Sequence, residues 1–93
     1  MIPLDARLAL HPQVRFRRFE DEGILLDQKS GEALVVSDVA TRLLELTDGS
    51  RPLHDAVAIL AREYDASTPQ IEEDVLRFAA ELAEAGLVTV AEP

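Results

Sequence analysis

Residues 68–86 read TPQIEEDVLRFAAELAEAG, and this stretch decides the fold. Thr68 supplies a capping hydroxyl before Pro69, which suits the first helical position, and acidic residues follow in the early turns, where the helix dipole favours anions. Apolar residues then recur at helical spacing until Gly86 stops the pattern. They are Ile71, Val75, Phe78 and Leu82. The stretch predicts a helix whose apolar stripe packs against the rest of the chain.

Two further helices are predicted upstream of this one. The first begins at a cap supplied by Ser37 or Asp38 and ends at Asp48-Gly49. Its apolar positions are Val39, Leu43, Leu44 and Leu46. Ser50 can cap the second, which runs to a break in the pattern at Tyr64-Asp65. Its apolar positions are Leu53, Val57, Leu60 and Ala61.

The first part of the chain changes to a period of two, which is typical of strands. Apolar and basic residues roughly alternate over residues 14–19, and short apolar runs follow at residues 24–27 and 32–36. Residues 20–23 and 28–31 separate these runs with polar residues and glycine, as tight turns require. Three short strands joined by tight turns make a meander, one face of which must be covered for stability.

The fold class expected from this order is α+β and winged helix-turn-helix-like. It is a three-stranded antiparallel meander followed by three helices, and Leu87–Val90 can form a short terminal strand. Residues 1–12 contain two prolines and weak periodicity, so we assign them to an N-terminal arm of undefined position. Residues 13–90 form the domain, and residues 91–93 are assigned to a frayed tail.

Composition limits the function. A chain of 93 residues has room for one domain, and without cysteine it can form no disulfide, thiolate metal site or cysteine nucleophile, which favours a cytoplasmic location. No apolar run is long enough to cross a membrane. We find no catalytic motif, no metal-ligand spacing around the two histidines, and no sign of a bound cofactor. The formal net charge of −9 opposes nucleic-acid binding, and it either serves solubility alone or steers a basic partner segment toward the domain.

Several motifs together resemble the PqqD-like family over roughly residues 12–90. They are the paired Leu25-Leu26, the Asp48-Gly49 after the first helix, and the Asp74-Val75 in the last helix. The resemblance implies a peptide-recognition domain that binds the leader segment of a ribosomally made precursor and presents it to a modifying enzyme, often a radical S-adenosylmethionine enzyme. Asp27-Gln28 and Thr47 depart from the sequence pattern of the pyrroloquinoline-quinone branch. The sequence therefore leaves open whether the chain serves that pathway or a related one.

A free strand edge offers the physical means of binding, because its unpaired backbone groups can accept an extended peptide as an added strand. The third strand is our candidate edge, and the resemblance places the leader between it and the last helix. The predicted peptide-binding residues are Glu32, Ala33, Leu34, Val35, Val36, Asp74, Val75, Arg77, Phe78 and Leu82. Val75, Phe78 and Leu82 also fit a plain core stripe, and Asp74 also fits a helix-dipole role. Binding further requires that the N-terminal arm does not cover the edge.

Two alternatives remain at this point. A winged-helix DNA-binding regulator has similar helices, but Glu72, Glu73 and other acids on the last helix would be repelled by phosphates. A homodimerising scaffold module could use the same free strand edge without any peptide. Arg15, Arg17 and Arg18 could face an acidic leader or simply line a solvated strand face.

Overall fold

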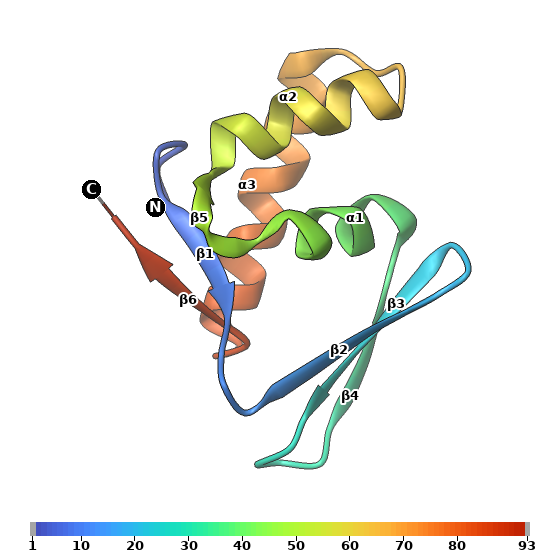
Figure 1. The fold of residues 1–93 in the computed structure, drawn as a ribbon, viewed down its shortest axis with the longest axis vertical. Coiled ribbons are helices and arrows are strands. Elements are labelled where there is room, and N and C mark those ends of the chain that lie inside the picture. The colour runs from blue at the N-terminus through green and yellow to red at the C-terminus, as the bar shows by residue number, and fades with distance from the viewer. Residues whose placement is uncertain (1, 93) are drawn as a thin grey trace.

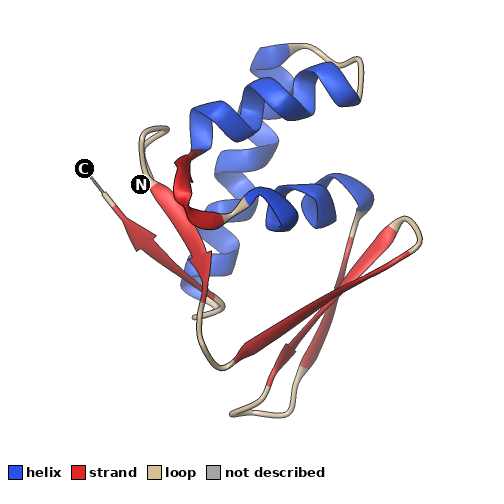
Figure 2. Cartoon of the chain, in the orientation of Figure 1, coloured by secondary structure: helices blue, strands red, loops and turns tan. Residues whose placement is uncertain are grey.

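The computed structural model describes residues 2–92; Met1 and Pro93, assigned above to the arm and the tail, lie outside the described residues. The described chain forms six strands and three helices (Figures 1 and 2). In chain order they are β1 (Arg7–Leu10), β2 (Val14–Phe19), β3 (Glu22–Asp27), β4 (Ala33–Val36), α1 (Asp38–Leu46), β5 (Asp48–Pro52), α2 (Leu53–Glu63), α3 (Thr68–Glu84) and β6 (Val88–Ala91). The strands form two antiparallel sheets, β2-β3-β4 and β5-β1-β6. The predicted meander, three helices and terminal strand are confirmed.

The sheet β2-β3-β4 extends away from the helices and has two short turns (Figure 1). Glu20 adopts a left-handed conformation with φ 57° in the turn between β2 and β3, and Gly31 does so with φ 78° in the turn between β3 and β4. Phe16 pairs with Leu25, which pairs with Leu34. Because directly opposed residues lie on the same face of a sheet, these three side chains define the inner face.

Gly23 lies where α1 packs tightly against the inner face of this sheet. A Cβ atom at this position would come within 2.5 Å of Thr41 Oγ1 and 2.8 Å of Phe16 Cε1. Thr41 is fully buried and donates a hydrogen bond to the carbonyl of Ser37 at 2.7 Å, so it has little freedom to move. The missing side chain at residue 23 therefore allows α1 to lie directly on β3.

The second sheet was not predicted. Arg7–Leu10, which the sequence placed in the arm, form the central strand β1 and pair with β5 on one side and β6 on the other. Leu8 is fully buried, so this segment is part of the folded core. Ala91, assigned above to the frayed tail, pairs with Arg7 and ends β6.

Two of the predicted helix caps are wrong, although the three helices are confirmed. Ser37 caps α1 as expected and accepts a hydrogen bond from the Ala40 amide. Ser50 lies in β5, and α2 starts after Pro52, which makes no side-chain capping bond. In α3 the cap is Ser67, whose hydroxyl accepts from the Gln70 amide.

One core joins the helices to both sheets. Its fully buried leucines and valine come from β1, β3 and all three helices, and they are Leu8, Leu25, Leu43, Leu53, Leu60, Val75 and Leu82. None of the helices within residues 2–92 is both long and apolar enough to cross a membrane.

Candidate functional site

Strand β4 is an edge of its sheet and leaves backbone groups unpaired on its open side. The amide of Asp27 donates to the carbonyl of Glu32 at 2.9 Å, which shows that Glu32 faces β3. In an antiparallel ladder, residues alternate between bonding the neighbour and facing away from it. Leu34 and Val36 therefore also bond β3, whereas the amide and carbonyl groups of Ala33 and Val35 point away from the sheet.

The N-terminal segment does not cover this edge. Arg7–Leu10 lie in the other sheet, between β5 and β6, and β4 pairs only with β3 among residues 2–92. Leu34 and Val35 remain 45% and 58% exposed. The edge is thus open to an extended segment of another chain.

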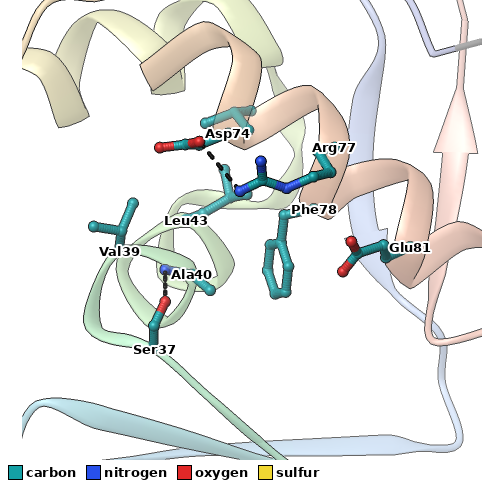
Figure 3. Close-up of a pocket in the computed structure, with 9 residues that line it drawn as sticks. Ser37, Val39, Ala40, Leu43, Asp74, Arg77, Phe78 and Glu81 are labelled. Atoms are coloured by element: carbon teal, nitrogen blue, oxygen red, sulfur yellow. Dashed lines mark hydrogen bonds and ion pairs between the residues drawn. The ribbon is translucent and has the colours of Figure 1, made fainter. Parts of the chain in front are cut away.

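A cleft between α1 and α3 lies beyond the end of β4. It has a volume of about 240 Å³, and Phe78 projects from α3 into the space that faces α1 and the sheet (Figure 3). The residues that line it are Ser37, Val39, Ala40, Leu43, Asp74, Val75, Arg77, Phe78 and Glu81. The floor is apolar and the α3 rim is charged. An apolar side chain of a bound peptide fits such a floor, since a few buried anchors usually dominate peptide binding.

A second cleft, of about 260 Å³, lies at the other end of β4, beside the end of α3. Its lining residues are Leu25, Asp27, Ser30, Glu32, Ala33, Leu34, Ala85 and Leu87. Because one cleft adjoins the first residues of β4 and the other includes Ser37 just after it, β4 runs antiparallel to α3 between them. We call the two clefts and the edge between them the β4–α3 groove.

The groove carries mainly negative charge. Its walls hold the carboxylates of Asp27, Glu32, Asp74 and Glu81 against one guanidinium, that of Arg77. Asp74 is already engaged, because it accepts hydrogen bonds from Arg77 at 3.2 Å and from the Gln70 side-chain amide at 3.1 Å. The Asp74 pair therefore shapes the α3 rim, while the other carboxylates face the groove without an ion pair among residues 2–92.

Ion pairs fix α1, which forms one wall. Glu45 on α1 accepts two hydrogen bonds from Arg18 on β2, each at 3.0 Å, and Arg42 donates to Glu63 on α2 at 2.8 and 2.9 Å. The hydrogen bond from Arg18 holds the pKa of Glu45 below its ordinary value, although partial desolvation opposes this. The wall is thus tied to both the sheet and the neighbouring helix.

The predicted residues divide into groove and core. Seven reach the groove through side chain or backbone edge: Glu32, Ala33, Leu34, Val35, Asp74, Arg77 and Phe78. Val75 lines the cleft between α1 and α3 although it is almost fully buried. Val36 and Leu82 are core residues, and their side chains line neither cleft.

Several lining residues were missed. Val39 and Leu43 on α1 were interpreted only as apolar positions of that helix, and Ala40 and Glu81 were not proposed as site residues. The i, i+4 spacing of Val39 and Leu43 places them on one helix stripe. That spacing does not reveal that the stripe ends at an open cleft, because the packing of α1 against α3 is a tertiary feature.

The sequence pattern of the family described as "Coenzyme PQQ synthesis protein D (PqqD)" matches residues 22–88. A "PqqA binding protein" of Rhodopseudomonas palustris strain HaA2 is 30% identical over 84 residues, which cover 90% of this chain and 80% of the relative. Another, from Xanthomonas axonopodis pv. citri strain 306, is 34% identical over 79 residues, covering 83% and 84%.

Solved structures share the fold. TbiB1, solved in complex with the TbiA(β) leader peptide, superposes with a TM-score of 0.78 at 24% identity, over 86% of this chain and 93% of that one. The PqqD truncation of Methylobacterium extorquens PqqCD gives a TM-score of 0.74 at 28% identity, over 88% and 87%. It is described as a functional and stand-alone recognition element for ribosomally synthesised and post-translationally modified peptides.

Proposed function

Because this chain belongs to the PqqD family, we propose that it binds the leader segment of a ribosomally made precursor peptide and presents it to a modifying enzyme. The leader adds as a fourth strand along β4 and fills the β4–α3 groove. The domain itself performs no chemistry. It supplies a fixed place where an otherwise disordered peptide becomes extended.

The open edge of β4 is the observation that carries this proposal. Ala33 and Val35 direct two amide donors and two carbonyl acceptors away from the sheet, and these groups match the hydrogen-bonding pattern of an extended peptide. Backbone bonds alone would hold any sequence. The clefts at the two ends of β4 add selectivity, because each accepts an apolar side chain that the peptide presents at the correct spacing.

The charges of the groove indicate the chemistry of the leader. Four carboxylates and one guanidinium line it, so a segment with apolar anchors flanked by lysine or arginine is favoured over an acidic one. Rim charges act mainly on the association rate and are screened by salt. We therefore expect binding to weaken as ionic strength rises, without being abolished, because the backbone bonds and apolar anchors remain.

The names of the relatives support one kind of ligand. Proteins named for PqqA binding support a precursor of the PqqA kind as the ligand here. For the receiving enzyme we propose a peptide-modifying enzyme of the radical S-adenosylmethionine type, as the resemblance to the PqqD-like family implies. Ribosomes release such a precursor in the cytoplasm, and we place the encounter there.

Calorimetric titration tests this function directly. The purified chain is titrated with a synthetic leader of the short precursor encoded beside it, and with a scrambled leader of the same composition as control. We expect micromolar or tighter binding of the leader and at least tenfold weaker binding of the scrambled peptide. Equal affinities for the leader and the scrambled peptide would mean that net charge alone drives binding, and would contradict selection of a sequence by the groove. No heat, together with unchanged amide spectra, would reject the function.

A further inference from the structure

The outer face of the sheet β2-β3-β4 carries an apolar strip edged by arginines. Register pairs Arg15 with Leu26 and Arg17 with Ile24, and Ile24 in turn pairs with Val35. Directly opposed side chains lie on the same face, so all five lie together, opposite the inner face that α1 covers. Arg15, Arg17, Ile24 and Leu26 line a depression of about 390 Å³ on this outer face.

The apolar residues of this strip are unusually exposed to solvent. Leu26 is 39% exposed, Ile24 40% and Val35 58%, and these are among the most exposed large apolar residues within residues 2–92. The alternation of a half-buried sheet normally places polar residues on the solvent face. Contiguous apolar side chains on such a face with a charged edge are typical of an interaction surface.

The two arginines at the edge are available to a partner. Within residues 2–92 neither Arg15 nor Arg17 forms an ion pair, although Arg15 donates one hydrogen bond to the carbonyl of Pro12 at 3.1 Å. Arg18, on the inner face, binds Glu45. The chain has twice as many acidic as basic residues, so two guanidinium groups that lack a carboxylate partner in the described part of the chain, beside one apolar strip, depart from its average surface. They complement carboxylates on an apolar partner surface.

We propose that this outer face binds the modifying enzyme itself, through an apolar patch of that enzyme edged by aspartate or glutamate. The proposal rests on the proposed function only in naming that enzyme as the partner. The outer face and the β4–α3 groove are separate surfaces that share β4. The backbone edge of Val35 faces the peptide while its side chain faces the enzyme, so both can be held at once.

A second copy of this chain or a nucleic acid fits the outer face less well. Two copies stacked through this face would bring their four arginines together, and like charges in an interface are costly. A nucleic acid would meet a molecule with a formal net charge of −9. The face also has a modest size, roughly 20 Å by 14 Å from strand dimensions, which suits a transient complex and falls well short of a stable dimer interface.

Charge reversal on this face tests the proposal. The double variant Arg15→Glu, Arg17→Glu is compared with a matched reversal elsewhere, Arg7→Glu, Arg62→Glu. Both are titrated with the purified modifying enzyme encoded beside the precursor gene, and separately with the leader peptide. We expect the outer-face variant to bind the enzyme at least tenfold more weakly while its affinity for the leader changes less than twofold. The matched variant should bind both as the wild type does.

A second variant, Ile24→Thr, keeps a β-branched residue on the strand and removes apolar surface, and it should also weaken enzyme binding. Unfolding curves establish that each variant is folded. Unchanged enzyme binding by the outer-face variants overturns the proposal even when the leader binds. Self-association in sedimentation, or binding of duplex DNA, that is lost in the same variants also overturns it. Failure of the wild type to bind leader, with enzyme binding intact and sensitive to Arg15 and Arg17, rejects the groove function alone.

Discussion

Replacement of Val35 by proline tests the role of the β4 backbone edge in peptide binding separately from the stability of the domain. The Val35 amide points away from β3, so proline removes a donor that the fold does not use. Proline is tolerated on edge strands for this reason. Leu34→Pro is the matched control, because the Leu34 amide faces β3 and its loss breaks the ladder.

The expected changes in affinity and stability follow from the opposite directions of the Val35 and Leu34 amides. In Val35→Pro the bound leader loses one hydrogen bond, and a peptide carbonyl is left facing the proline ring; together these cost about 2 kcal/mol. This corresponds to a Kd raised roughly thirtyfold. The free energy of unfolding should stay within about 1 kcal/mol of the wild type. Leu34→Pro should lose about 1–3 kcal/mol of stability, because a partly buried carbonyl on β3 loses its donor.

Two measurements on the proline variants test strand addition at β4. Calorimetry gives the affinity for the leader, and urea unfolding gives the stability of each variant. An affinity for Val35→Pro within threefold of the wild type would refute strand addition at β4. An unfolded Val35→Pro would refute the assigned direction of its amide, because the sheet would then depend on that donor.

The remaining predictions concern the groove, the packing of α1 and its ion pair. Phe78→Ala should weaken leader binding by about 1–2 kcal/mol, or roughly five- to thirtyfold, in calorimetry, because it removes an apolar anchor site. Leu76→Ala on the same helix, outside both clefts, should bind as the wild type does. Gly23→Ala should cost about 1–3 kcal/mol in urea unfolding through overpacking. Glu45→Gln should reduce the loss of stability on acidification. The Arg18 bond lowers the folded pKa of Glu45, so its contribution is present above the unfolded pKa and disappears as pH falls through the folded one.

Each of these has a contrary outcome. Equal losses for Phe78→Ala and Leu76→Ala would mean that general weakening of α3, rather than the cleft, controls binding. A Gly23→Ala variant as stable as the wild type would contradict the close contact of α1 with the sheet. An acid transition that is unchanged by Glu45→Gln would show that its pair with Arg18 has the same strength in the folded and unfolded chains.

The meander and the helices could be predicted because local signals determine them. The Gly31 turn, the alternation in β2 and the stripe that ends at Gly86 each depend on neighbouring residues only. The resemblance then directed attention to the edge of β4 and to α3. The sequence does not determine which residues along α3 face the groove and which face the core. For this reason Leu82 was included among the groove residues although it is a core residue.

The second sheet escaped prediction because it depends on long-range pairing. β5 reads DGSRP, a composition with weak strand propensity, and it is a strand because β1 pairs with it. The amides of Leu53 and His54 extend this contact to the carbonyls of Ala6 and Leu4. Such pairing leaves no periodic trace in either segment, and Ser50 consequently was mistaken for a helix cap.

Amide hydrogen exchange, measured residue by residue with and without the leader, tests the central claim most directly. In the free protein the amides of Ala33 and Val35 should exchange quickly, while that of Leu34 is protected by β3. Addition of leader should protect Ala33 and Val35 and leave Phe16, on the opposite edge β2, unchanged. Protection at Phe16 in place of Ala33 and Val35 would put the peptide on the wrong edge and contradict binding in the β4–α3 groove.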